Sequence, residues 1–136
     1  MNKKNNKGFS LVELIVVVAI MAVLVGVLAP AYLRYVEKSR YQKDCSAVAE
    51  VEEAIKIAVA EENVFKSMTA GTPYHVTVPT SGAPTSTDAA TLVAEVVKTI
   101  PTVELTSKTI TSAVTITVTV SANGSVTVTN DIPTLS

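Results

Sequence analysis

The stretch that decides the fold is residues 14–33, which read LIVVVAIMAVLVGVLAPAYL. Tyr32 is the only ionisable residue in it, and about 20 apolar residues are what a helix needs to cross a bilayer core. Three lysines precede this stretch in the polar segment 1–8, MNKKNNKG. By the positive-inside rule they favour a cytoplasmic N-terminus, whereas the four basic residues of segment 34–43 oppose it. The sequence predicts a membrane-spanning helix with its leader in the cytoplasm.

Beyond residue 33 the pattern becomes amphipathic. Apolar residues recur at spacings of three, four or multiples of these, which is typical of a helix: Leu33, Val36, Val48, Val51, Ile55, Ala58 and Val59. The pattern predicts a helix from Phe9 to about Phe65, ended by Gly71 and Pro73. Such a helix would be about 85 Å long at 1.5 Å per residue. We therefore expect half of it to protrude from the folded part of the chain.

Three residues are unusual in this helix. Pro30 lacks a backbone donor and crowds the preceding turn, so a kink or loosened turn is expected at Gly26 and Pro30. Glu13 lies at the edge of the apolar segment, and a carboxylate inside hydrocarbon costs about 2.5–3.5 kcal/mol on insertion scales. Glu13 therefore either lies at the membrane interface or has a positively charged partner.

Residues 7–20, KGFSLVELIVVVAI, resemble the N-terminal signature of type IV prepilins. The resemblance implies that a prepilin peptidase cuts between Gly8 and Phe9 and N-methylates the new Phe9 amine. It also implies that Glu13, fifth after the cut, is the family's characteristic glutamate. The resemblance favours a contact of Glu13 with the amine of an adjacent subunit, while the amine of its own chain, one helical turn away, is also within reach. Pro30 matches a proline common in pilins of this class.

This close resemblance covers residues 7–35 and implies a structural subunit. The chain would be a single-pass prepilin in the cell membrane and then part of an extracellular pilus, or fimbrium. Its partners would be further copies in a helical filament, the prepilin peptidase and the pilus assembly machinery. A pseudopilin of a secretion or DNA-uptake system would share the same residues and is the alternative within the superfamily.

The C-terminal half has a different composition. Residues 69–136 contain all 18 threonines of the chain but only 6 of its charged residues, and threonine suits strands. We predict a strand at Tyr74–Val78, a loop at Thr80–Thr87 and a helix at Ala89–Thr99 with Asp88 as its N-cap.

The clearest strand signal is Ile110–Val120, where Val or Ile alternates with Thr. A three-residue loop, Ala122–Gly124, would pair Ser121 with Ser125 and make one face of the resulting hairpin uniformly apolar. That face should cover the stripe of the long helix. The Thr face would point to solvent, as an ordinary exposed strand face or as a carrier of glycans or adhesive contacts.

The predicted fold class is α+β, a long N-terminal helix with a small antiparallel sheet packed on its C-terminal half. We expect a removable leader at 1–8, a hydrophobic transmembrane or filament-core helix at 9–33, an amphipathic helix at 34–68 and a Thr-rich head at 69–136. Within the amphipathic part, Arg34–Lys43 has net charge +3 and Asp44–Glu62 has net charge −5. These blocks are either two solvated helix faces or complementary surfaces of staggered parallel helices.

The composition argues against several function classes. Lys+Arg (11) and Asp+Glu (12) nearly cancel, so there is no direct nucleic-acid signal. One cysteine, Cys45, allows no intramolecular disulfide, and one histidine, His75, gives no metal cluster or acid/base relay. We expect no enzyme, cofactor or metal. The alternative from another class is a membrane-anchored binding module, or one secreted after signal-peptidase cleavage at Ala29–Ala31.

Overall fold

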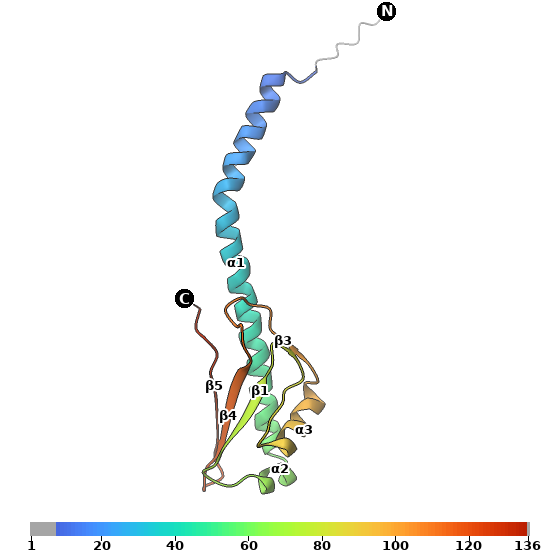
Figure 1. Cartoon of the computed structure of the whole chain (residues 1–136), viewed down its shortest axis with the longest axis vertical. Coiled ribbons are helices and arrows are strands. Elements are labelled where there is room, and N and C mark those ends of the chain that lie inside the picture. The colour runs from blue at the N-terminus through green and yellow to red at the C-terminus, as the bar shows by residue number, and fades with distance from the viewer. Residues whose placement is uncertain (1–7, 136) are drawn as a thin grey trace, which may run out of the picture. The chain divides into compact units, whose positions relative to one another are not determined.

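The structure is a computed structural model that describes residues 8–135. The chain divides after Val36 into two compact units, and helix α1 (Leu11–Val59) contributes to both of them (Figure 1). The first unit is the apolar part of α1. The second unit begins at Glu37 and contains the rest of α1 and all the strands.

The long helix is shorter than the predicted Phe9–Phe65. α1 ends at Val59, and a separate short helix, α2, spans Glu62–Ser67. The last turn of α1 tightens, because the N–H groups of Ala60 and Glu61 donate to carbonyls only three residues back, at 3.1 Å each. Glu61 is then extended, and the chain turns to bury the Val64 side chain completely. Helix α2 also buries one of its faces, through Val64, so the apolar periodicity of the sequence continues across the break between the two helices.

The core of the second unit forms where the helix stripe meets the sheet. The buried residues of α1 recur at helical spacing and contribute one side of the core: Val48, Val51, Ala54, Ile55, Ala58 and Val59. The predicted stripe began too early, since Leu33 is 67% exposed and lies in the first unit. Asp44, a charged residue, is fully buried on the same side of the helix.

The main sheet has three antiparallel strands in the order β1-β4-β5 (Figure 1). They are β1 (Pro73–Val78), β4 (Val114–Val120) and β5 (Val126–Asn130). In the central strand, β4, Val and Ile are buried and the threonines between them are half-buried. The strand predicted from Ile110 therefore starts late. Ile110 is buried, but it belongs to the segment that leads into β4.

The predicted register of the hairpin is confirmed. Ser121 donates its N–H to the Ser125 carbonyl at 2.8 Å, which aligns β4 and β5 as expected. Gly124 has φ +82°, a left-handed conformation that suits glycine. The apolar face is less completely covered than expected, because Val126 on the edge strand β5 remains 36% exposed.

The segment between β1 and β4 has more structure than predicted. Helix α3 (Ala90–Thr99) buries Leu92 and Val96. A second, two-stranded sheet pairs β2 (Ser81–Gly82), inside the predicted loop, with β3 (Val103–Glu104). These strands are too short to have a periodic signature. With these corrections the predicted α+β class is confirmed: a long N-terminal helix with a small antiparallel sheet packed against it.

Candidate assembly site in the N-terminal helix

Helix α1 begins with a polar contact in its first turn. The backbone N–H of Ser10 donates to the Glu13 carboxylate at 2.9 Å, and the N–H of Leu14 donates to the Ser10 carbonyl at 3.2 Å. A glutamate that reaches back in this way forms one arm of a capping box, whose sequence signal is Ser-x-x-Glu. Glu13 thus satisfies a donor at the helix start. The sequence carries this signal in residues 10–13, but the prediction did not include the capping role.

The predicted cleavage site lies just before this turn. Gly8 and Phe9 precede α1 and are exposed, with Phe9 91% exposed. The rest of the predicted leader, residues 1–7, lies outside the described residues. A cut between Gly8 and Phe9 would create an amine on the residue adjacent to Ser10, whose N–H the Glu13 carboxylate already accepts.

Helix α1 continues through both Gly26 and Pro30, and the kink or loosened turn expected at these residues stays a prediction. In an α-helix the N–H of residue 30 would donate to the carbonyl of residue 26. Pro30 has no N–H, so the two residues share one missing hydrogen bond. A single missing bond leaves the turns on either side intact, which explains why the helix persists.

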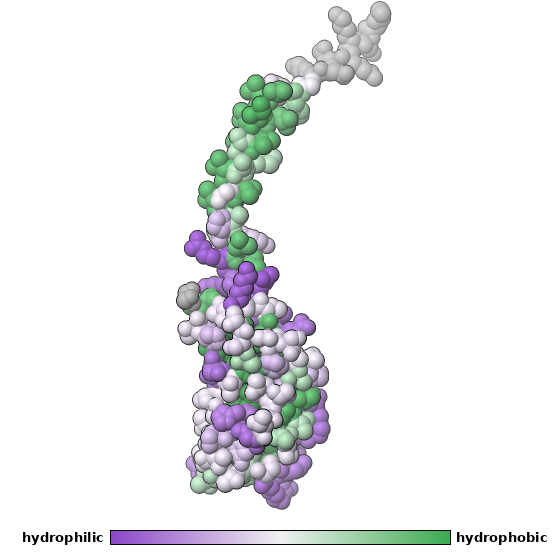
Figure 2. All heavy atoms as spheres, viewed as in Figure 1, coloured by the Kyte–Doolittle hydropathy of each residue, from purple (hydrophilic) through white to green (hydrophobic). Residues whose placement is uncertain are grey.

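The first unit exposes apolar side chains all around α1. From Leu11 to Leu33 the large apolar side chains are between 46% and 73% exposed. Figure 2 shows these residues as an almost continuous hydrophobic segment. Within residues 8–135, α1 is the one helix long and apolar enough to cross a membrane. Such a surface needs lipid or protein around it.

Residues 3–29 match the family described as "Prokaryotic N-terminal methylation motif". This match covers the Gly8–Phe9 bond, Glu13 and most of the apolar segment. The N-terminal segment of the chain therefore carries the methylation motif of prepilins. This match confirms the resemblance of that segment to prepilins, and with its long apolar helix the chain is type IV pilin-like.

Three curated relatives are similar to the chain. It is 35% identical over 68 residues to "Prepilin peptidase-dependent protein A" of Clostridium perfringens (strain 13 / Type A), a match covering 49% of each protein. It is 34% identical over 59 residues to a "Type IV major fimbrial protein FimA" of Dichelobacter nodosus, covering 43% of this chain and 38% of that protein. A second FimA of the same organism is 28% identical over 89 residues, covering 65% and 56%. The chain thus spans about half the length of these relatives, and no solved structure matches it.

The second unit of the chain contains a polar anchor that the sequence did not predict. The buried Asp44 carboxylate accepts the N–H groups of Thr106 at 2.8 Å and Ser107 at 2.6 Å. Two helical turns earlier, Glu37 accepts the Ser107 hydroxyl at 2.7 Å and the Lys108 N–H at 2.6 Å. The two carboxylates of α1 therefore hold loop 106–109. No local pattern signals this anchor, because its partners are 62 to 72 residues apart.

These contacts also favour the ionised form of Glu37. The hydrogen bond from the Ser107 hydroxyl lowers the pKa of the Glu37 carboxyl. Desolvation opposes this effect, while the N–H groups of Lys108 and Thr109 and the nearby charge of Arg40 reinforce it. The Glu37 carboxylate is thus ionised and hydrogen-bonded to loop 106–109, rather than surrounded only by solvent.

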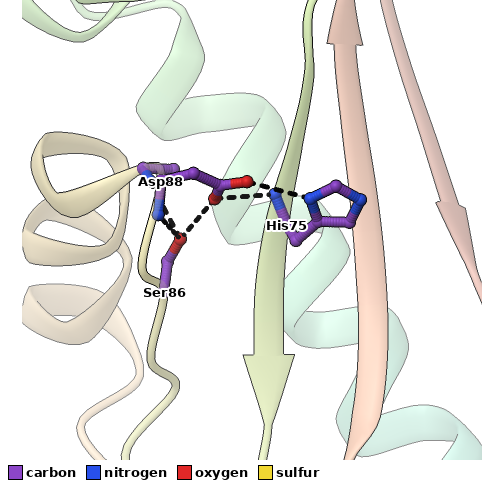
Figure 3. A network of polar contacts seen from close by, with 4 residues as sticks. His75, Ser86 and Asp88 are labelled. Carbon is purple, nitrogen blue, oxygen red and sulfur yellow. Dashed lines mark hydrogen bonds and ion pairs between the residues drawn. The ribbon is translucent and has the colours of Figure 1, made fainter.

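A second network joins β1 to the chain before α3 (Figure 3). The Asp88 carboxylate accepts the backbone N–H of His75 at 3.0 Å, contacts the His75 Nδ1 at 2.9 Å and accepts the Ser86 hydroxyl at 2.8 Å. Burial raises the pKa of Asp88, but the hydrogen bonds from His75 and Ser86 outweigh it and lower the pKa to about 2. The prediction that Asp88 caps the helix is wrong, since Ala89 is the N-cap and Asp88 is engaged by His75.

The remaining candidate residues gather into no reactive site. Cys45 is a half-buried free thiol, and the neighbouring Tyr41 hydroxyl donates to the Pro133 carbonyl at 3.0 Å. The hydrogen bond between Tyr41 and Cys45 raises the pKa of the tyrosine. Among residues 8–135 there is no group of three or more His, Cys, Asp or Glu side chains that could hold a metal ion.

Proposed function

We propose that this chain is a structural subunit of a type IV pilus-like surface filament. It is inserted in the membrane as a prepilin, cut after Gly8, N-methylated on Phe9 and polymerised through its N-terminal helix. The observation that carries the proposal is the methylation motif at residues 3–29 on a helix whose apolar side chains are exposed on every side. Its division into a leader (1–8), a filament-core helix (9–33), an amphipathic helix (34–68) and a head (69–136) is part of the proposal.

The exposed apolar surface accounts for the two environments of the subunit. Hydrocarbon covers it while the helix is in the membrane, and the same helices of neighbouring copies cover it in the filament. The leader lysines favour a cytoplasmic N-terminus, so the head lies outside the cell membrane before assembly. The role is structural rather than enzymatic, and processing depends on a prepilin peptidase and an assembly machinery. One relative is itself named for its dependence on prepilin peptidase.

The N-terminus of the mature protein tests this proposal. We expect mass spectrometry to find a chain that starts with N-methylated Phe9. A chain that starts near Tyr32 would instead indicate secretion by signal peptidase, and a retained leader would indicate a plain membrane anchor. Either result would contradict the proposal.

Gly8 provides a sharper test of the peptidase. The exposed Gly8–Phe9 bond has no side chain on its N-terminal side, and a peptidase that requires a small residue there should reject valine. Gly8→Val should leave the leader attached in essentially all of the protein, and the mass difference of eight residues is easily resolved. Gly8→Ala, which keeps a small residue at the same position, is the control that should be processed normally. Normal processing of Gly8→Val would rule out this peptidase.

A pseudopilin of a secretion or DNA-uptake system is the second candidate, because the matched motif ends at residue 29 and says nothing about the head. A pilus subunit should give long surface filaments that disappear when the protein is removed. A pseudopilin should instead leave the cell surface unchanged and block secretion or DNA uptake. Electron microscopy of cells with and without the protein separates the two.

A further inference from the structure

Opposite charges lie at two levels of α1 in the second unit. Arg40 and Lys43 are three residues apart and both exposed. Glu50 and Glu53 are also three residues apart and exposed, further along the helix. A spacing of three puts the members of each pair on the same side of the helix. We call Arg40 and Lys43 the basic pair and Glu50 and Glu53 the acidic pair.

The basic pair makes no direct salt bridge in the described part of the chain. Glu37 and Asp44 are close in sequence to Arg40 and Lys43, but both carboxylates are engaged by loop 106–109. Among residues 8–135 neither member of the basic pair forms an ion pair. Because the hydrogen bonds of the anchor occupy both carboxylates, two exposed cations remain without a direct salt bridge, and Arg40 only lies near the charge of Glu37.

The acidic pair is only weakly engaged. In the described part of the chain Glu50 forms no ion pair, and Glu53 contacts Lys56 at 3.4 Å. Both side chains of that contact are more than half exposed, and an exposed pair at this spacing contributes little to stability. The Glu53 carboxylate can therefore exchange Lys56 for a better-placed cation.

We propose that the basic pair of one copy binds the acidic pair of a second copy, with the two helices parallel and displaced by ten residues. Residue 40 then lies level with residue 50 and residue 43 with residue 53, so one displacement of about 15 Å along the helix aligns both contacts. This inference rests on the proposed function, because insertion in one membrane gives all copies the same direction.

Such a contact leads to an open assembly. The two pairs are different surfaces of one molecule, so each copy that donates its basic pair still presents its acidic pair to the next. Charge complementarity of this kind sets register and selects partners more than it adds affinity. Because every subunit repeats the contact, a small contribution at each one fixes the axial stagger of the whole filament.

The same four residues also align in an antiparallel contact, with Arg40 against Glu53 and Lys43 against Glu50. That contact uses both pairs of both copies at once and closes into a dimer. It is the competing arrangement, and the experiments below distinguish it from the parallel one.

Charge reversal tests whether the pairs meet. The full-length variants Arg40→Glu with Lys43→Glu, and Glu50→Lys with Glu53→Lys, should each lower the yield of sheared surface filaments by about tenfold or more. Cleavage and methylation of Phe9 should stay at the wild-type level. Combining all four substitutions restores opposite charges and should recover the yield to within about twofold of wild type. The control is Glu95→Lys with Lys98→Glu, which inverts the Glu95–Lys98 contact on α3 and should assemble normally.

Zero-length cross-linking tests the direction. In filaments grown from mixed ¹⁴N and ¹⁵N protein, a carbodiimide should join Lys43 of one copy to Glu53 of another. Links between copies from Lys43 to Glu50 would show the antiparallel contact and overturn the inference. Normal filaments from either two-residue reversal would overturn it while leaving the proposed function intact. Failure of the wild-type chain to be processed or to form filaments would overturn the proposed function, and the inference with it.

Discussion

At the scale of single residues, the carboxylate of Glu13 is positioned by its own helix before any neighbour is present. Its contact with the Ser10 N–H holds it at the start of α1, next to the residue that cleavage would convert into an N-terminus. A new ammonium group in an apolar bundle is strongly disfavoured unless an anion accompanies it. Glu13 is the only carboxylate before Glu37, so it is the anion available within the apolar helix.

Substitutions at Glu13 separate its two roles. Glutamine can still accept the Ser10 N–H but carries no charge, whereas alanine loses both the cap and the charge. We expect Glu13→Gln and Glu13→Ala to insert and to be cleaved normally, and both to form few filaments by electron microscopy. If helix capping alone mattered, Glu13→Gln would assemble like wild type. Abundant filaments from Glu13→Ala would contradict any role of Glu13 in filament assembly.

Glu37→Gln is the matched control for the loss of a carboxylate. It lies beyond the apolar segment, and its amide oxygen can still accept donors from loop 106–109. We expect it to affect assembly far less than Glu13→Gln does.

The buried Asp44 predicts a clear effect on stability. Asp44→Ala leaves the N–H groups of Thr106 and Ser107 without their acceptor. The Ser107 bond is buried, and a buried donor left unsatisfied costs about 1–3 kcal/mol, while the part-buried Thr106 bond adds less. We expect a loss of about 2 kcal/mol or more in the free energy of unfolding, measured by denaturant titration of the full chain in detergent. Asp44→Asn keeps one acceptor oxygen and should lose less. Equal stability of Asp44→Ala and wild type would contradict the anchoring role.

At the scale of secondary-structure elements, α1 is a continuous helix with one turn, at Gly26–Pro30, that is less stable than the others. Pro30 deprives the Gly26 carbonyl of its donor, and glycine has the lowest helix propensity of the non-proline residues. The turn between them is therefore held by fewer bonds than any other turn of the apolar segment. The single chain tolerates this, as the unbroken helix shows.

In a filament the weak turn should open. Stretching the helix during transfer from the bilayer would break hydrogen bonds first where they are fewest, so we expect lost 1–4 hydrogen bonds between about residues 22 and 31. A filament structure determined by cryo-electron microscopy tests this. Pro30→Ala should restore regular helix there. A wild-type filament with regular helix throughout this span would show the prediction to be wrong.

At the scale of the whole molecule, two lowered pKa values make the stability of the second unit depend on pH. The pKa of Asp88 is about 2 instead of its ordinary 3.8, and hydrogen bonds likewise lower the pKa of Glu37 below its ordinary 4.5. Groups whose pKa is lower in the folded state stabilise the fold while ionised. That contribution is present above these ordinary values and is lost as the pH falls toward 2.

We therefore expect the free energy of unfolding of the full chain to decrease steadily from pH 5 to pH 2.5, measured by denaturant titration in detergent. Asp88→Asn should flatten this dependence because it removes one of the titrating groups. Unchanged pH dependence in Asp88→Asn would show that the contact with His75 does not stabilise the fold.

The sequence predicted those parts of the molecule that depend on near neighbours. The apolar run is a local signal that predicted the long helix, although not its end at Val59. The alternation in β4 and the Asn-Gly loop are local signals too, and they predicted the register of the hairpin. Contacts across long separations had no such signal. The prediction for Asp88 is wrong because its partner His75 lies 13 residues away on β1. For Asp44 and Glu37 the sequence indicates only charged helix surfaces, because their partners in loop 106–109 are distant in sequence.

The strand order has a consequence for when the head folds. β1 ends at Val78, but its partner β4 begins only at Val114, and β5 adds to β4 from the far side. Such non-local pairing is slow, because the intervening chain must first close into a loop. If the chain is inserted in a membrane as proposed, its apolar helix emerges during synthesis and inserts long before any strand can pair with its neighbour. The proposed order is that the nascent chain is first tethered to the bilayer and forms its sheet last, so that folding proceeds on a chain already held at the membrane.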